Sequence, residues 1–224
     1  TYAELVSVPT ECLAPKPAGF SWAQAAALPL VGLTTYRALF TRGRLRAGES
    51  MLVVGAGGGS ATMAVQLASR AGAAISVTSS SPDKIAQARG EGAGGGVLHT
   101  DPDWPEQARQ MSPSGAGFDL ILDPVGRWPE SVRVLRPGGR LVVLGANAAE
   151  TAPMDVRAFY FGQCDLLGTT MGNVRDFTGL VDLIAEHRVP PPVIDRVFPL
   201  DEAAQAHERL ESTRGFGKTV LEHT

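Results

Sequence analysis

A glycine-rich stretch constrains the fold of this 224-residue chain more than any other feature. The apolar residues 51–54 lead directly into Gly55-Ala-Gly-Gly-Gly59, and small and apolar residues recur at helical spacing from Ala61 onward. A buried parallel strand, a tight turn and a helix N-terminus have this pattern, because glycine permits sharp bends and the close approach of a ligand. Such a turn aims free backbone N–H groups and the positive end of the helix dipole at one point, which suits a pyrophosphate.

The glycine motif departs from the strict G-x-G-x-x-G pattern. Its best register is Ala56-x-Gly58-x-x-Ala61, in which the final alanine still permits close packing of helix on strand. Ser60 is expected to be the helix N-cap, and Gly72 is expected to end the helix. Taken alone, the motif fits a glycine turn without a ligand as well as a phosphate site, so its surroundings decide.

Composition excludes several classes of function. The net charge of −3 gives no basic surface for nucleic acid. Cys12 and Cys164 lie far apart and form neither a CxxC motif nor a disulfide framework, which favours a reducing, cytoplasmic setting. No apolar run has membrane-spanning length and no signal peptide opens the sequence, so we expect no membrane partner.

Strand and helix patterns alternate between residues 50 and 170. The continuous apolar runs indicate strands covered on both faces, and the stretches between them are amphipathic. This alternation predicts an α/β doubly wound sheet of six parallel strands, whose ligand lies at the carboxyl ends of the strands. The expected strands are residues 51–54, 74–77, 97–99, 118–123, 141–145 and 166–169, and the expected helices are 60–71, 82–89, 104–111, 128–135 and 154–162.

Both ends of the chain depart from this alternation. Residues 1–19 are expected to form one or two short strands and a proline-rich turn, and residues 193–198, 201–211 and 218–222 a strand, a helix and a strand. These pieces predict part of a second structural unit. Residues 92–96, which include four glycines, are expected to form a flexible loop.

From residue 1 to residue 222 the chain resembles the medium-chain dehydrogenase/reductase superfamily, and within it the zinc-independent quinone reductase-like and zinc-type alcohol dehydrogenase-like branch. The segments that carry the resemblance are residues 2–4, 25–29, 32–39, 55–68, 135–140, 168–171, 198–203 and 217–220. The resemblance implies a GroES-like catalytic domain and a Rossmann domain. It assigns residues 1–30 to the end of the catalytic domain, 31–188 to the NADP-binding Rossmann domain and 189–224 to a return segment, with most of the catalytic domain lacking.

The zinc-binding relatives in this superfamily carry a cysteine just before the Rossmann domain. Residues 28–34 contain no cysteine, so we expect no catalytic zinc and no other metal in this chain.

The end of the second strand bears on the choice of cofactor. An NAD-selective site commonly places a carboxylate there, whereas this chain has Ser79, Ser80 and Ser81. Serine hydroxyls can donate to a 2′-phosphate and Lys84 supplies charge, so the sequence favours NADP(H); the resemblance places Ser79 and Lys84 beside that phosphate. The alternative is that residues 81–83 only cap a helix and that Lys84 is solvated, and the nearby Asp83 favours this alternative.

Further cofactor-binding residues follow from the resemblance. The phosphate turn contributes Gly58, Gly59, Ser60 and Ala61, and His99 stands where relatives often have a tyrosine near the adenosine. The remaining candidates line the nicotinamide end or the cleft in this family, although each could equally have a structural role; they are Thr34, Asp123, Gly145, Asn147, Thr169 and Met171. No acid–base dyad is evident, so the catalytic residues are unassigned.

Three functions are consistent with these features. The leading hypothesis is an NADP(H)-dependent, zinc-independent oxidoreductase that transfers hydride to a quinone, enone or related carbonyl substrate. The second is a catalytically incomplete NADP-binding module or fragment. The third, a zinc-containing alcohol dehydrogenase or a class I methyltransferase, is less favoured, since methyltransferases typically have an acid at the end of the second strand.

The sixth strand predicts an oligomer. It would form the edge of the sheet, and an exposed edge invites pairing. The resemblance implies that residues 165–170 pair with the same strand of a second copy, which gives a homodimer.

Overall fold

A six-stranded parallel sheet organises the residues that the structure, a computed structural model, describes, namely 2–212 and 214–223. The strand order is β3-β2-β1-β4-β5-β6, the order of a doubly wound dinucleotide-binding sheet. The predicted α/β class with six parallel strands is therefore confirmed. The strands are β1 (Ser50–Val53), β2 (Ala74–Ser79), β3 (Gly95–Leu98), β4 (Phe118–Asp123), β5 (Leu135–Val143) and β6 (Asp165–Gly168).

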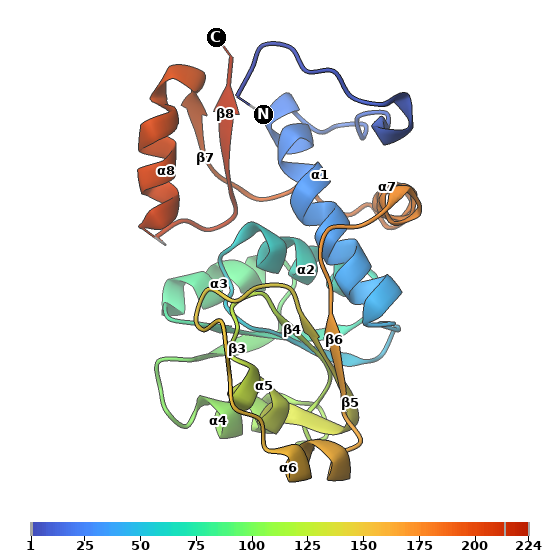
Figure 1. Cartoon of the computed structure of the whole chain (residues 1–224), viewed down its shortest axis with the longest axis vertical. Coiled ribbons are helices and arrows are strands. Elements are labelled where there is room, and N and C mark those ends of the chain that lie inside the picture. Colours follow the sequence, from blue (N-terminus) through green and yellow to red (C-terminus); the bar gives the residue numbers. More distant parts are fainter. Residues whose placement is uncertain (1, 213, 224) are drawn as a thin grey trace.

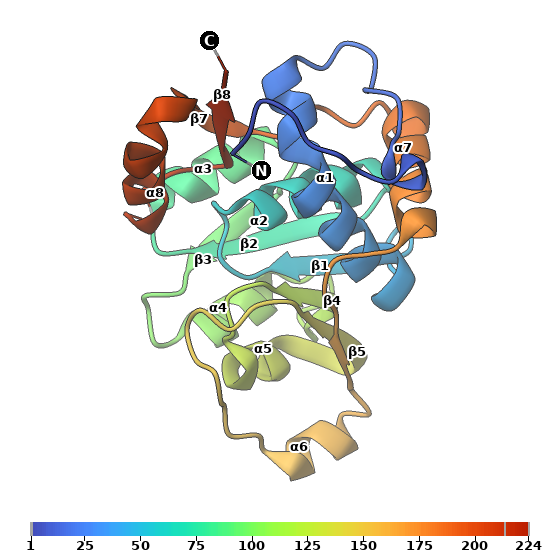
Figure 2. The same ribbon diagram turned by 45° about the horizontal axis from the view of Figure 1, so that its top comes forward.

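Helices cover both faces of this sheet. In Figure 2, α1, α2, α3 and α7 lie on one side of the sheet, and α4 and α5 lie on the other. Sequence analysis did not predict α1 and α7, each of which begins with a reciprocal capping box, Ser21 with Gln24 and Asn173 with Asp176. The helices are α1 (Trp22–Tyr36), α2 (Gly59–Arg70), α3 (Pro82–Gly90), α4 (Trp104–Met111), α5 (Trp128–Val134), α6 (Val156–Phe161), α7 (Val174–His187) and α8 (Ala203–Glu211).

Alternation along the central strands creates two apolar cores. Met51 and Val53 of β1 face the core that α2, α3 and α7 cover, whereas Leu52 faces the core that Trp104 of α4 covers. Leu52 lies opposite Ile121 of β4, and Ile121 lies opposite Leu141 of β5, so side chains on one face stay in line across the sheet. Both faces of the strands are buried, which explains the unbroken apolar runs in the sequence.

The N-terminal segment differs from its prediction. Residues 2–19 form no strand, and their regular structure is one short 3-10 turn at Thr10–Cys12. Apart from Pro17, which is half-buried, the side chains of residues 2–19 are exposed. Strand structure requires a hydrogen-bonding neighbour, and no described strand pairs with this segment. The prediction of one or two strands here was wrong.

The C-terminal segment forms a small unit of its own. Strands β7 (Ile194–Pro199) and β8 (Lys218–Glu222) pair in parallel, and α8 connects them. A short 3-10 turn, Leu200–Glu202, precedes α8, which therefore begins two residues later than expected. Figure 1 shows this unit beside α1, above the six-stranded sheet.

The expected glycine loop at residues 92–96 is partly a strand. Gly95 and Gly96 belong to β3 and pair with Ser76 and Val77 of β2. A Cβ at Gly96 would lie 2.6 Å from the Val77 carbonyl oxygen, so glycine allows the two strands to approach closely. The prediction of a flexible loop is corrected for these two residues.

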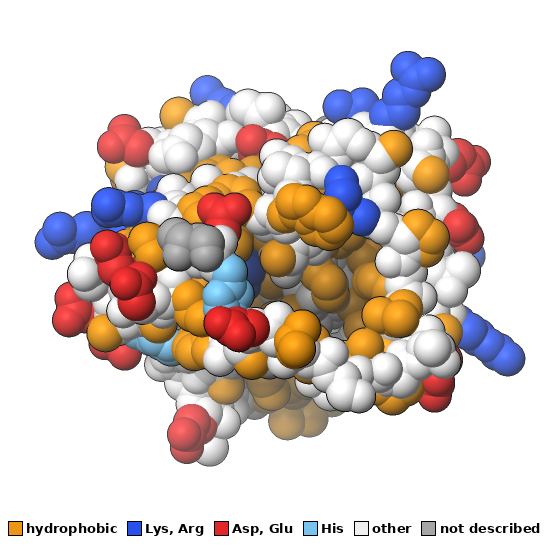
Figure 3. Space-filling view, turned by 90° about the horizontal axis from the view of Figure 1, so that it is seen from above, with side chains coloured by type: hydrophobic (Ala, Val, Ile, Leu, Met, Phe, Trp, Pro, Cys, Tyr) orange, Lys and Arg blue, Asp and Glu red, His pale blue; other side chains and the backbone are white. Residues whose placement is uncertain are grey.

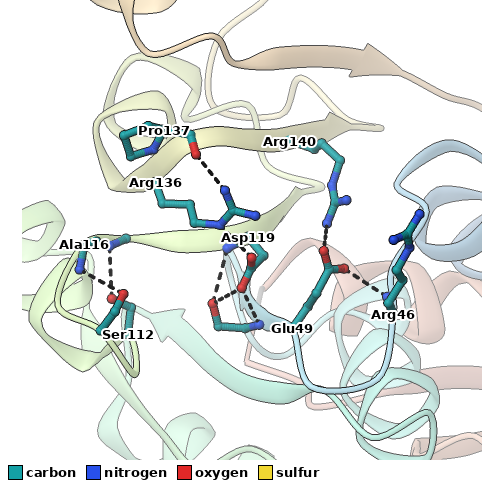
Figure 4. Close-up of polar contacts among 11 residues, drawn as sticks. Arg46, Glu49, Ser112, Ala116, Asp119, Arg136, Pro137 and Arg140 are labelled. Carbon is teal, nitrogen blue, oxygen red and sulfur yellow. Dashed lines mark hydrogen bonds and ion pairs between the residues drawn. The ribbon is translucent and has the colours of Figure 1, made fainter.

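Polar contacts join the amino ends of three central strands (Figure 4). Asp119 at the start of β4 accepts hydrogen bonds from the Ser50 backbone N–H at 2.8 Å and the Ser50 hydroxyl at 2.7 Å, and its carboxylate pairs with Arg136 of β5 at 2.6 Å. Partial burial opposes ionisation of Asp119, but these bonds outweigh it and hold the pKa of Asp119 below its usual value. The amino ends are thereby tied together, and the candidate site lies at the opposite edge.

The described residues include no helix with the length and apolarity required to cross a bilayer.

Replacing Asp119 by alanine should lower the free energy of unfolding by about 2–3 kcal/mol, because it removes a charged acceptor and leaves donors of Ser50 and Arg136 unpaired. Urea denaturation followed by circular dichroism measures the change. The matched control is Arg44→Ala, which removes the exposed ion pair with Asp165 from a position outside strand β6 and should stay within about 1 kcal/mol of the wild type. Equal losses for both variants would contradict this role for Asp119.

Candidate functional site

A cavity of about 560 Å³ lies at the carboxyl ends of β1 and β2. Its size suits a small organic ligand or part of a dinucleotide. One wall is the glycine turn, and the opposite wall comes from the C-terminal unit. The candidate residues from the sequence that line it are Gly58, Gly59, Ser60, Ala61, Ser79, Ser80, Lys84, His99 and Asn147.

The glycine turn has the backbone geometry that the sequence predicted. Gly55 and Gly57 have φ angles of +82° and +144°, values that side-chain-bearing residues rarely adopt. Helix α2 begins at Gly59 with Gly58 as its N-cap, so Ser60 lies inside the first turn and the prediction that it is the N-cap was wrong. The free N–H groups of this first turn, at the start of α2, are potential donors to an anion.

The end of β2 contributes hydroxyl groups and a cation to the cavity. The buried Ser79 hydroxyl donates to the Ala56 carbonyl over 3.4 Å and accepts the Ser81 N–H over 3.2 Å. Lys84 projects from the first turn of α3 toward Gly57, where a Cβ would lie 3.0 Å from the lysine Cδ. Desolvation lowers the pKa of Lys84, Asp195 opposes that shift, and Arg209 adds to it.

His99 lines the cavity, and its imidazole is within hydrogen-bond distance of the Thr78 hydroxyl. The Thr78 hydroxyl is 3.1 Å from His99 Nδ1 and also accepts the Gly55 N–H over 3.0 Å. Partial burial lowers the pKa of His99, and the positive charge of Arg127 lowers it further. The imidazole is therefore neutral at pH 7 and is held in place by the same threonine that contacts the turn.

Asp123 shapes a loop. Its fully buried carboxylate accepts backbone N–H groups of Val125 at 2.9 Å, Gly126 at 2.8 Å and Arg127 at 2.7 Å, and the Ser131 hydroxyl lies 3.3 Å away. These bonds fix the turn after β4. Asp123 does not itself line the cavity, although Val125 in this turn does.

The candidates for the nicotinamide end fall outside the cavity, except for Asn147. Thr34 lies next to Met171, with 3.8 Å between the hydroxyl and the sulfur, and its hydroxyl also donates to the Leu30 carbonyl. The Thr169 hydroxyl is buried without a hydrogen-bond partner among the described residues. Gly145 packs so tightly on Pro124 that a Cβ would collide with its carbonyl oxygen.

The C-terminal unit supplies cavity residues that sequence analysis missed. Asp195 of β7 and Arg209 of α8 form an ion pair with N–O distances of 2.9 and 3.0 Å. Gly217 and Thr219 also line the cavity. The one signal in the sequence that could have located this wall was the pair of glycines at positions 215 and 217, since glycines mark close backbone approach.

The side chains that could donate to a metal ion decide whether this site could hold one. Among residues 2–212 and 214–223, no three His, Cys, Asp or Glu side chains gather as a metal site. The residues that the structure describes therefore do not fit a zinc ion.

Comparison with known proteins identifies relatives of this fold and site. The sequence profile of a family described as zinc-binding dehydrogenase matches residues 92–221. A zinc-type alcohol dehydrogenase-like protein of Leptosphaeria maculans is 33% identical over 208 residues, which are 89% of this chain and 58% of that protein. The chain thus spans less than two thirds of the length of this relative.

Two solved structures are similar over nearly the whole chain. An NAD-dependent alcohol dehydrogenase superposes with a TM-score of 0.93 at 33% identity, covering 100% of this chain and 65% of that one. A quinone oxidoreductase of Thermus thermophilus, solved also in complex with NADPH, superposes with a TM-score of 0.84 at 33% identity, covering 99% of this chain and 73% of that one.

The imidazole of His99 should titrate below 6.5, its usual pKa, because burial and Arg127 disfavour the charged form. Between the lowered pKa and 6.5 the unfolded chain binds more protons than the folded one, so stability should rise with pH across that window. Histidine ring NMR signals followed against pH, assigned with the variant His99→Gln, measure the midpoint. A midpoint at or above 6.5 would be inconsistent with this environment.

Proposed function

We propose that this chain, which belongs to the zinc-binding dehydrogenase family, is the cofactor-binding part of an NADPH-dependent enzyme. The enzyme reduces a quinone, enone or related carbonyl compound without zinc. The relatives named above are oxidoreductases of the medium-chain superfamily. Family membership argues against the methyltransferase alternative. Bound NADPH supplies the hydride in such a reaction. The residues of this chain bind the dinucleotide and hold it at the strand ends.

The end of β2 is the observation that carries the proposal. Ser79 and Ser80 lie there and line the cavity together with Lys84. An NAD-selective site commonly has a carboxylate at this position, which would repel a 2′-phosphate. A hydroxyl and an ammonium group can instead donate to that phosphate, and a charge-assisted hydrogen bond contributes about 1.5–3 kcal/mol. One relative in the structural comparison is named NAD-dependent, so this strand end is the feature to test.

The Asp195 carboxylate also lines the cavity, and a carboxylate there could oppose phosphate binding. Its two oxygens accept hydrogen bonds from Arg209, so the pair as a whole carries no net charge. The third charged side chain among the described residues that line the cavity is the cation Lys84.

We further propose that residues 1–30 and 189–224 belong to the catalytic domain and that residues 31–188 form the cofactor domain. The separate sheet of β7 and β8 supports a second unit, although α1 is one continuous helix across residue 30. Seen from above, the face on the side of this unit gathers apolar side chains around a hollow (Figure 3). Among the exposed apolar residues of the N-terminal segment are Leu5 and Leu13, and exposed apolar patches mark interaction surfaces.

The alternative of a binding module without catalytic activity shares the same cofactor site. Phosphate binding needs the glycine turn, Ser79 and Lys84, all of which line the cavity. Catalysis also needs a substrate pocket. Among the described residues that line the cavity, no acid–base dyad is evident. Turnover of an electrophile with NADPH separates the enzyme from the module.

The edge strand β6 supports a homodimer. Its hydrogen-bonding neighbour among the described strands is β5 alone, so no described strand covers its other edge, where Arg42 Nε donates to the Gly168 carbonyl over 3.1 Å. We propose that residues 165–170 pair with the same strand of a second copy, since open edges favour such pairing.

Titration of the chain with NADPH and NADH should give tighter binding of NADPH. The variant Lys84→Ala should raise the Kd of NADPH about ten- to hundredfold and change that of NADH by less than about threefold, because only NADPH carries the 2′-phosphate. Cofactor fluorescence measures both constants.

Lys16→Ala is the matched control for this titration. Lys16 lies outside the cavity, with its ammonium group over the ring of Trp22, so its removal should leave both constants unchanged. Equal weakening of NADPH and NADH by Lys84→Ala would contradict the assigned contact with the 2′-phosphate.

Sedimentation equilibrium should find a dimer at micromolar concentration, and Gly168→Pro should shift it toward monomer. The Thr169 N–H bonds to β5, so the Gly168 N–H points to the open edge, and proline removes that donor. The control is Gly168→Ala, which keeps the backbone N–H and whose Cβ would meet nothing within 4 Å among the described residues. A monomeric wild type would contradict the dimer.

A further inference from the structure

Residues 214–217, the loop that leads into β8, lie directly against the glycine turn. The Gly217 N–H donates to the Gly57 carbonyl over 2.8 Å, and Gly58 and Gly217 form an isolated parallel bridge. Two segments about 160 residues apart in sequence thus share backbone contacts at the cavity. The Gly57 carbonyl belongs to the peptide unit that leads into Gly58, the N-cap of α2. A hydrogen bond that fixes this peptide unit therefore also fixes the direction of the N–H groups that follow at the start of α2.

Asp195 is the residue that holds this loop. Its Oδ2 accepts from Arg209 Nε over 2.9 Å, and its Oδ1 accepts from Arg209 Nη2 over 3.0 Å and from the Phe216 backbone N–H over 3.1 Å. The Asp195 side chain is only 10% exposed. The hydrogen bonds from Arg209 are the largest cause that lowers the pKa of Asp195, so the carboxylate is ionised when it makes these contacts. One side chain therefore joins β7, α8 and the loop.

The packing leaves this carboxylate little freedom. A Cβ at Gly215 would lie 2.7 Å from Asp195 Oδ2, and Gly217 has a φ angle of +105°. Glycine is needed at position 217 for the backbone conformation and at position 215 for the space that the carboxylate occupies. A larger residue at position 215 forces the carboxylate and the backbone of residue 215 apart, which disturbs the contacts of Asp195 with Arg209 and Phe216.

We propose that Asp195 is a positioning residue for dinucleotide binding: by anchoring the loop through Arg209 and Phe216, it fixes the Gly217–Gly57 hydrogen bond and so preorganises the pyrophosphate-binding turn. This inference rests on the proposed function of the cavity and adds the residue that aligns it. Preorganisation matters because a donor that must be ordered on binding reduces affinity.

A second reading of the same residues makes a different prediction. Arg209 and Asp195 both line the cavity near Lys84, so Arg209 could contact the 2′-phosphate directly. Loss of a direct contact would weaken NADPH alone. Loss of alignment weakens NADPH and NADH equally, because both cofactors carry the pyrophosphate.

The test uses two variants of the 224-residue chain that disturb the Asp195 carboxylate in different ways. Asp195→Asn keeps the shape and removes the charge, whereas Gly215→Ala keeps the charge and displaces the carboxylate. Each should raise the Kd of NADPH and of NADH about tenfold or more, because a charged hydrogen-bonded anchor is lost. The two factors should be equal for Gly215→Ala, whereas in Asp195→Asn the factor for NADPH should be the smaller one, because Arg209 then lacks its counter-charge beside the cavity. The control Asp182→Asn, which alters an exposed carboxylate of α7 outside the cavity, should change neither constant.

Hydrogen–deuterium exchange of the cofactor-free variants gives a readout that binding does not influence. Peptides covering residues 55–61 and 214–220 should exchange faster in both variants, and a peptide from β4 should be unchanged. Unchanged affinities, a loss confined to NADPH, or faster exchange throughout the chain would each overturn the proposal. If the wild type binds neither dinucleotide, the proposed function fails, and the exchange comparison still decides whether Asp195 holds the turn.

Discussion

The close approach of bare backbone at the end of β1 is the constraint on which the rest of the site depends. Gly57 lies against Lys84, Gly55 lies against Val125, and the Lys218 side chain fills the space where Gly59 would carry a Cβ. A side chain at any of these positions would move the turn or its neighbours. The turn can therefore present backbone N–H groups to a ligand only because three separate segments pack onto glycine.

The sheet brings these segments to one edge. All six strands run parallel, so their carboxyl ends meet at one edge, and an apolar core covers each face of the sheet. Contacts of Asp119 with Ser50 and Arg136 secure the opposite edge, and Asp123 fixes the turn after β4 with three backbone hydrogen bonds. The polar residues buried around the sheet hold loops in position, and the cavity is lined by backbone, hydroxyl groups, a few charges and apolar side chains such as Val125 and Leu144.

Much of the fold could be predicted from local pattern. The bounds of β4 and α4 agree with the expected ranges, because each element has a clear apolar run or a first-turn proline. Residues 2–19 have strand-like composition without a neighbour to pair with, so composition alone predicted strands that do not form. Pairing is a property of the whole chain, and local pattern does not contain it.

The site was predicted in part, for a similar reason. Ser79, Lys84 and His99 follow strand ends in the sequence, and the parallel sheet brings them to the cavity as expected. The role of Ser60 as N-cap was wrong because Gly58 already adopts the extended conformation that a cap requires. Asp195 and Arg209 were missed because no spacing rule connects residues of β7 and α8 with a turn far earlier in the chain.

A crystal structure of the chain with bound NADPH is the most direct test of the glycine turn as the dinucleotide site. The account predicts the pyrophosphate within hydrogen-bond distance of the backbone N–H groups at Gly59 and Ser60, and the 2′-phosphate beside Ser79 and Lys84. A pyrophosphate bound away from the start of α2 would contradict the account, as would a 2′-phosphate that contacts neither residue.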